Sequence, residues 1–166
     1  GTDIEGCQHG THVAGIAAGK SATINGVAKD ANIIAIQVFS KITDAASCSR
    51  GGLTSPCALS YTSDGNLALE HVYSLRNTYN IAAVNISIGG GQYFSACDAS
   101  QSSTKAAIDN LRSVGIATVI SSGNESYKNS VEAPACISTA VSVGATTKAD
   151  AEADYSNYHP VMLSLF

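Results

Sequence analysis

Short apolar runs recur along the chain and predict buried β-strands. They are rich in isoleucine, valine and alanine and carry almost no charge, which is typical of strands covered on both faces of a sheet. We expect four such strands, at residues 31–39, 81–88, 115–122 and 137–145.

Two amphipathic segments separate the first three strands and predict helices, at residues 64–79 and 103–114. In each segment the apolar side chains recur at intervals that place them on one face of a helix. These side chains are Ala68, Val72, Leu75 and Tyr79 in the first helix and Ala107, Ile108, Leu111 and Val114 in the second. Alternating strands and helices imply an α/β fold with a parallel sheet and right-handed crossovers.

Two of the predicted strands end in unusual segments. Binding sites in parallel sheets form outside the carboxyl ends of the strands. One strand runs into the glycine-rich segment at 89–92, and another into the Ser-Gly-Asn-Glu segment at 122–125. Consecutive glycines leave bare backbone against which another chain can lie, although a mobile turn is an alternative.

Composition indicates a globular protein and excludes two classes of partner. The 166 residues are 45% hydrophobic and 13% charged, and their length suits one domain. The net charge is −4 and the basic residues do not cluster, so we expect no nucleic-acid partner. We expect no membrane partner either, because no apolar run approaches the roughly 20 residues of a membrane span. The chain opens without Met or a leader-like segment and closes on apolar residues, which suggests a piece cut at both ends.

The cysteines favour an oxidising compartment, because they lie in hydrophilic loops. Cys48 and Cys57 bracket a Gly/Ser/Pro segment, for which a short disulfide is the natural interpretation. Cys97 and Cys136 can also pair, which leaves Cys7 over. Five free thiols are the alternative. We expect the protein to be secreted or extracellular.

Two histidines, His9 and His12, lie in a glycine- and alanine-rich segment near the start of the chain. With Cys7 they could bind zinc, but the segment lacks the glutamate and the spacing of a helical zinc motif, and no fourth ligand stands out. We therefore expect no metal site here. Polar residues at the start of a helix are the other ordinary interpretation.

Four ordered segments resemble the subtilases, the subtilisin-like serine proteases. HGTHVAGIAAG resembles the histidine motif of that family, VNISIGGG its substrate strand, VISSGNE its oxyanion-asparagine motif, and APACISTAVSVGA the strand that follows. The resemblance covers the chain from about Cys7 to Asn157. It implies that residues 1–166 are a partial peptidase domain, with a three-layer parallel β-sheet, helices on both faces, and both ends incomplete.

The resemblance implies a catalytic role for two residues. His9 matches the general base, which takes the proton of the serine nucleophile and returns it to the leaving amine. Asn124 matches the asparagine whose amide donates to the oxyanion of the tetrahedral intermediate. His12 matches a second histidine that is structural, so we expect it to be packed and hydrogen-bonded.

The resemblance also implies two substrate-binding segments. The first pairs with the substrate backbone like an added strand, and the second forms one wall of the primary specificity pocket. The side chains of that wall are small, which implies an open pocket, with Glu125 at its rim. The binding residues are Ser87, Ile88 and Gly89 in the first segment and Ser121, Ser122 and Gly123 in the second.

The rest of the family's catalytic triad is missing from the chain. Asp3 does not follow an apolar strand and does not resemble the family's aspartate motif, and no Gly-Thr-Ser-Met-Ala type motif occurs. We expect a serine endopeptidase whose 166 residues are inactive alone. The alternatives are a peptide-binding pseudoprotease that has lost the serine, and a zinc-dependent hydrolase.

Three further expectations concern regions outside the motifs. Residues 41–63 form an insertion in the peptidase domain. No cofactor is certain, although calcium remains possible in the full-length domain. Apart from protein or peptide substrates, the expected partner is a second copy, through exposed sheet edges.

Overall fold

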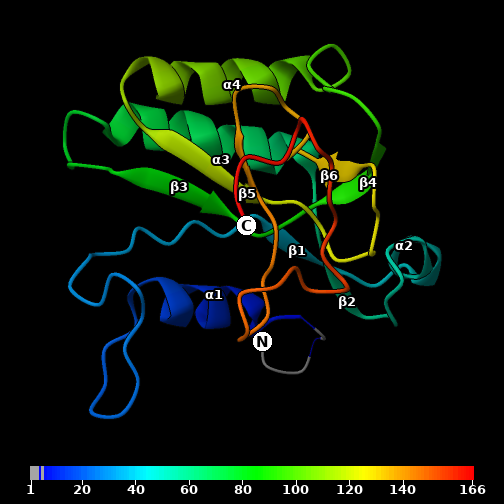
Figure 1. Ribbon diagram of the computed structural model, residues 1–166, viewed down its shortest axis with the longest axis horizontal. Helices are drawn as coiled ribbons and strands as arrows, with labels where there is room; N and C mark the ends of the chain where they lie inside the picture. The colour runs from blue at the N-terminus through cyan, green and yellow to red at the C-terminus, as the bar shows by residue number, and fades with distance from the viewer. Residues whose placement is uncertain (1–3, 5) are drawn as a thin grey trace. The chain divides into compact units, whose positions relative to one another are not determined.

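The computed structural model describes residue 4 and residues 6–166. The chain forms two compact units, Gly1–Gly65 and Asn66–Phe166, and Figure 1 shows their helices and strands. Asp3, which the sequence analysis rejects as the triad aspartate, lies outside the described residues.

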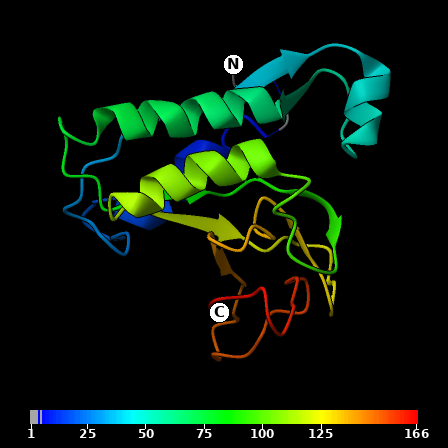
Figure 2. The ribbon, with the colours of Figure 1, turned by 90° about the horizontal axis from the view of Figure 1, so that it is seen from above.

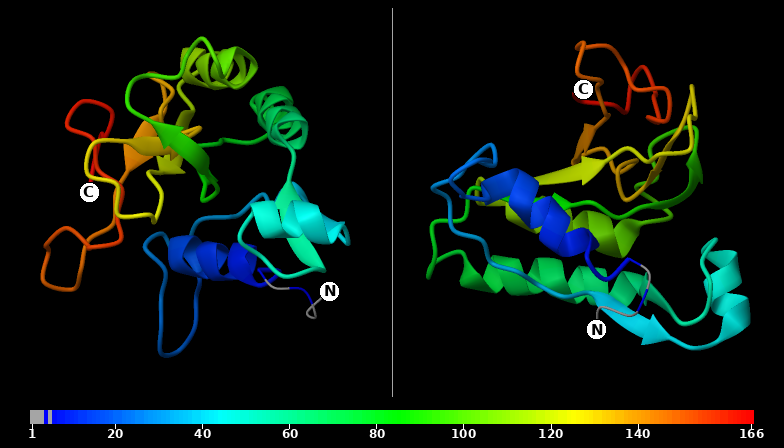
Figure 3. Two further views of the ribbon diagram at one scale, coloured as in Figure 1. Left: turned by 90° about the vertical axis from the view of Figure 1, so that its right-hand side faces the viewer. Right: turned by 90° about the horizontal axis from the view of Figure 1, so that it is seen from below.

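The first unit contains two helices and an antiparallel strand pair. The helix α1 spans His9–Ala18 and α2 spans Ala45–Arg50, and the strands are β1 (Phe39–Ile42) and β2 (Cys57–Ser60). Between the two strands the chain passes through α2, which lies at one end of the strand pair (Figure 3). The predicted disulfide between Cys48 and Cys57 is present and joins α2 to β2.

The strand expected at residues 31–39 is wrong except for its last residue. Only Phe39 belongs to a strand, and Ile33 and Ile34 are 49% and 44% exposed. The apolar pattern suits a buried strand, but a strand also needs a neighbour to complete its backbone hydrogen bonds. Among the described residues no strand pairs with residues 31–38.

The second unit is built on a parallel sheet, as the sequence predicts. Its order is β3 (Ala83–Ile86), β5 (Ala117–Ser121) and β7 (Val141–Val143), each shorter than the apolar run that contains it. A separate antiparallel pair joins β4 (Gly90–Tyr93) to β6 (Val131–Ala133). Part of the glycine segment is therefore a paired strand rather than open backbone.

Both predicted helices form, and they cover one face of this sheet. The helix α3 spans Thr62–Leu75 and crosses the boundary between the two units, and α4 spans Ser102–Ser113. The two helices lie side by side (Figure 2). The α/β fold class with a parallel sheet is thus confirmed.

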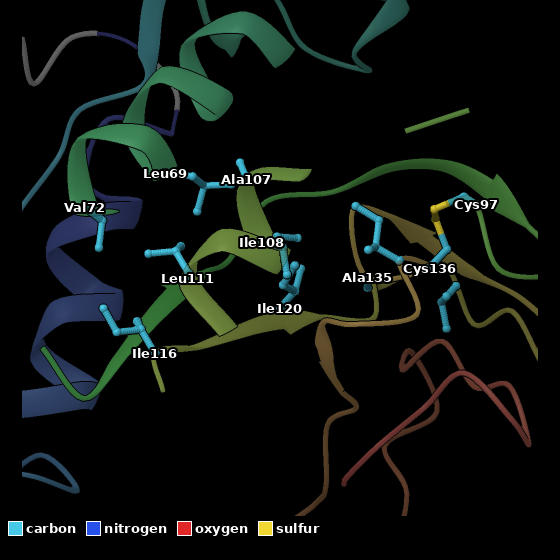
Figure 4. Close-up of a cluster of buried hydrophobic side chains, with 12 residues drawn as sticks. Leu69, Val72, Cys97, Ala107, Ile108, Leu111, Ile116, Ile120, Ala135 and Cys136 are labelled. Atoms are coloured by element: carbon cyan, nitrogen blue, oxygen red, sulfur yellow. A yellow bond between two sulfur atoms is a disulfide. The ribbon is translucent and has the colours of Figure 1, made fainter. Parts of the chain in front are cut away.

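The core lies between these helices and the sheet (Figure 4). Ile108 and Leu111 of α4 and Ile120 of β5 have no exposed surface. Tyr79 and Val114, which the helical pattern also places in the core, are exposed, because each lies beyond the end of its helix.

A second disulfide joins Cys97 to Cys136, and both residues belong to this core. Both sulfurs belong to buried residues, and the Cys97 N–H also donates to the Cys136 carbonyl (3.0 Å). The pairing that the sequence left possible is therefore present, and Cys7 is left free and exposed.

Candidate active site

Asn124 lies in the loop that follows β5, at the carboxyl end of the central strand of the parallel sheet. It is exposed, while its backbone N–H donates to Glu125 Oε2 (2.8 Å). The preceding residue, Gly123, is buried and has a φ of +113°, which an L side chain rarely adopts. The loop therefore presents the Asn124 side chain at the sheet's carboxyl edge, where a reacting group can be reached.

The buried side chain of Asn157 holds this loop by hydrogen bonds. Its Oδ1 accepts from the backbone N–H groups of Glu125 and Tyr127, each at 3.0 Å. Its Nδ2 donates to the Ser122 carbonyl (3.1 Å) and to Glu125 Oε2 (2.8 Å). The sequence analysis gives Asn157 no role, because its partners lie 30 or more residues away and no local pattern reveals them.

Backbone hydrogen bonds add to this attachment. The Asn157 N–H donates to the Gly123 carbonyl (3.1 Å), and the Ser126 N–H donates to the Tyr155 carbonyl (2.9 Å). The Tyr158 N–H donates to the Tyr127 carbonyl (2.7 Å). The loop at 122–127 and the segment at 155–158 are therefore joined along their length.

Glu132 of β6 lies against both of the predicted substrate-binding segments. A Cβ added at Gly89 would collide with Glu132 Oε2, and one added at Gly123 would lie 2.8 Å from Glu132 Cγ. The Glu132 side chain is thus approached by Gly89 from the segment between β3 and β4 and by Gly123 from the loop after β5. The parallel pairing of β3 with β5, in which Ile86 lies beside Ile120, brings the segments at 87–89 and 121–123 to the same edge.

The Glu132 carboxyl holds its proton unusually tightly. Burial is the main cause that raises its pKa to about 7, and charge repulsion from the nearby Glu125 carboxyl and a hydrogen bond with it contribute to the same rise. Near neutral pH the Glu132 carboxyl is therefore protonated, and so uncharged, for a substantial part of the time. The sequence analysis places only Glu125 at this site, since Glu132 is brought there by the pairing of β6 with β4.

His9 is the first residue of α1 and is exposed. Its backbone N–H donates to the Gly6 carbonyl (3.1 Å). His12 is exposed rather than packed, and no residue of α1 is buried. His9 and Asn124 belong to different units, so their meeting at one reacting bond stays a prediction.

Across residue 4 and residues 6–166, no group of three or more His, Cys, Asp or Glu side chains is arranged to hold a metal ion.

Within the same residues, every helix is too short or too polar to cross a membrane.

Comparison with known proteins gives a consistent result. The model of the subtilase family, Peptidase S8, matches residues 4–165. Alkaline protease 1 of Aspergillus clavatus is 32% identical over 162 residues, covering 98% of this chain and 34% of the relative. The subtilisin-like serine protease AsES of Sarocladium strictum is 34% identical, covering 95% of this chain and 35% of the relative. The chain thus spans about a third of the length of these curated relatives.

Solved structures agree at the level of the fold. A cold-adapted subtilisin-like serine proteinase is similar with a TM-score of 0.68 and 26% identity, over 95% of this chain and 47% of that one. The S218A mutant of the PatA protease domain gives a TM-score of 0.73 at 21% identity, over 97% of this chain and 51% of that one. The second likeness bears on the fold alone.

Proposed function

Because the chain belongs to the subtilase family, we propose that the protein containing it is a serine endopeptidase that hydrolyses peptide bonds of proteins. The family match over residues 4–165 carries this proposal. The loop after β5 supports it, because the backbone of that loop is firmly held while Asn124 stays exposed.

In this proposal His9 and Asn124 act on the same carbonyl group. The imidazole of His9 takes the proton of the attacking hydroxyl and returns it to the leaving amine. The side-chain amide of Asn124 donates a hydrogen bond to the carbonyl oxygen as that oxygen becomes negative. Exposure of both residues is what supports their access to a substrate.

The substrate backbone lies between two strand ends. The parallel pairing of β3 and β5 supports this arrangement, since it brings both proposed binding segments to one edge of the sheet. Gly89 is exposed, so a peptide can lie along its backbone, whereas Ser122 and Gly123 are buried. The binding residues are Ser87, Ile88 and Gly89 on one side and Ser121, Ser122 and Gly123 on the other.

The nucleophile and the orienting aspartate come from outside the 166 residues, which contain no Gly-Thr-Ser-Met-Ala type motif. The chain is then inactive alone, because acyl transfer needs the nucleophile. The same observation favours a second candidate, a peptide-binding pseudoprotease without the serine. The complete reading frame separates the two, since only the protease encodes the motif.

Several properties of the whole protein follow as proposals. It is secreted, which the two disulfides support. Residues 41–63 are an insertion within one partial peptidase domain, residues 1–166. The exposed apolar side chains at 31–38 support self-association of the isolated chain.

The decisive experiment uses the product of the complete reading frame. We expect a serine-directed phosphonate to label it and a peptide amide substrate to be hydrolysed. Asn124→Ala should lower kcat about 10²–10³-fold, a range known for this family rather than derived from this chain. Asn129→Ala is a matched control, because Asn129 is also exposed in the second unit. A folded protein that is not labelled favours the pseudoprotease, and an Asn124→Ala variant with unchanged kcat contradicts the oxyanion role.

A further inference from the structure

The loop at 122–127 is held in an unfavourable backbone conformation. Gly123 has a φ of +113°, and Ser126, which is not a glycine, has a φ of 62°. Glycine adopts a positive φ freely, but for a residue such as Ser126 it costs about 1–3 kcal/mol and persists only where the surroundings enforce it. Some other group must therefore keep this loop in place.

That group is the side chain of Asn157, which is fully buried. A carboxamide can accept two hydrogen bonds and donate two, and Asn157 makes all four, each of them to residues 122–127. The two N–H groups that it accepts, from Glu125 and Tyr127, lie on either side of Ser126. One side chain therefore spans the strained part of the loop.

A direct chain of contacts leads from Asn157 to Asn124. Asn157 Nδ2 donates to Glu125 Oε2, and the same oxygen accepts from the Asn124 backbone N–H, each at 2.8 Å. Glu125 is exposed, and besides these two bonds its carboxyl shares a hydrogen bond with the Glu132 carboxyl. Asn157 thus fixes a carboxylate that in turn fixes the backbone of Asn124.

We propose that Asn157 is a positioning residue for hydrolysis, which holds the loop so that the Asn124 amide meets the developing oxyanion. This inference rests on the proposed function. A positioning residue of this kind affects the transition state more than substrate binding, because the oxyanion exists only after attack. Its loss should therefore lower kcat and leave KM nearly unchanged.

The test is a double-mutant cycle in the complete gene product. Asn157→Ala should lower kcat up to about 100-fold, the scale on which small misplacements act. In an Asn124→Ala background the same change should lower kcat little further, because its target is already gone. Ser156→Ala is the matched control: Ser156 is also fully buried, but its hydroxyl bonds to Ala145 N–H and to the Asn157 carbonyl rather than to the loop. It should keep the wild-type kcat.

Two variants of Glu125 keep the inference testable if Asn157→Ala does not fold. Glu125→Ala breaks the same chain of contacts at an exposed residue, and Glu125→Gln keeps an oxygen that can accept from both partners. We expect Glu125→Gln to retain more of kcat than Glu125→Ala. Equal loss in the two variants overturns the inference, as does an equal effect of Asn157→Ala with and without Asn124.

A measurement that does not depend on catalytic activity tests this inference independently of the proposed function. Amide hydrogen exchange at Glu125 and Tyr127 should become faster in Asn157→Ala and stay slow in Ser156→Ala. If the wild-type protein shows no hydrolysis, the proposed function fails while the exchange result still tests the loop. Unchanged exchange in Asn157→Ala overturns the positioning role.

Discussion

The side-chain amide of Asn157 lies directly against the Cα of Gly123, so that a methyl group on that carbon would collide with Asn157 Nδ2. Gly123 also has a φ of +113°. Two independent requirements therefore make glycine necessary at this position, one from the backbone and one from packing. This contact joins the end of β5 to a segment more than 30 residues later.

We predict that Gly123→Ala destabilises the protein by about 2–5 kcal/mol. The left-handed backbone costs an L residue about 1–2 kcal/mol, and displacing Asn157 leaves buried polar groups unpaired at a further cost of about 1–3 kcal/mol. Gly115→Ala is the control, because Gly115 has a φ of +82° and open space around it. Urea titration should show a cost of only about 1–2 kcal/mol for the control. Equal costs would show that Asn157 does not restrict Gly123.

The Glu132 carboxyl predicts how stability depends on pH. Its pKa is raised from 4.5 to about 7, so between these values the folded protein binds more protons than the unfolded chain. Stability therefore falls as pH rises through this range, by at most about 1.4 kcal/mol per pH unit from this group. Glu132→Gln removes the titrating group and should flatten the curve.

The measurement for Glu132 is the free energy of unfolding at several pH values from about 4 to 8, for wild type and variant. The difference between the two proteins should grow in favour of Glu132→Gln as pH rises. Glu152→Gln is the matched control, because Glu152 is an exposed carboxylate in a surface ion pair with Lys128 (2.6 Å). A difference that does not change with pH would contradict the raised pKa.

Local patterns predict the second unit well because each of its apolar runs finds a neighbouring strand to pair with, in the order β3, β5, β7. The spacing of Ile108 and Leu111 identifies α4 and its buried face, and the run that contains Ile120 identifies β5. The bond between Cys48 and Cys57 was predictable because the two residues bracket a short Gly/Ser/Pro segment, whereas the pairing of Cys97 with Cys136 was only one possibility. The same logic fails at residues 31–38, where the pattern is right but a strand depends on a neighbouring chain segment.

The site is less predictable than the fold because it depends on contacts between distant segments. The resemblance identifies Asn124 from a short motif, but the support for that residue comes from Asn157. Likewise, Glu132 looks like an ordinary strand residue until β6 places it beside Gly89 and Gly123. Residues in the reactive motifs can therefore be identified from the sequence more readily than the residues that hold them in place.

The two disulfides should differ in their contribution to stability. Cys97 and Cys136 are separated by 39 residues and Cys48 and Cys57 by 9. Cross-links that close longer loops remove more entropy from the unfolded chain, which gives about 4 kcal/mol for the first bond and about 2.5 kcal/mol for the second. We therefore expect the double variant Cys97→Ser with Cys136→Ser to be the less stable of the two paired variants.

Urea titration of the two paired variants, each under oxidising conditions, checks this order. Wild type under reducing conditions should approach the sum of the two losses, because the bonds lie in separate units. Cys7→Ser is the control and should leave the free energy of unfolding nearly unchanged, since Cys7 is free and exposed. A larger loss from the shorter loop would mean that strain or contacts in the folded state, rather than loop length, set the contribution of each bond.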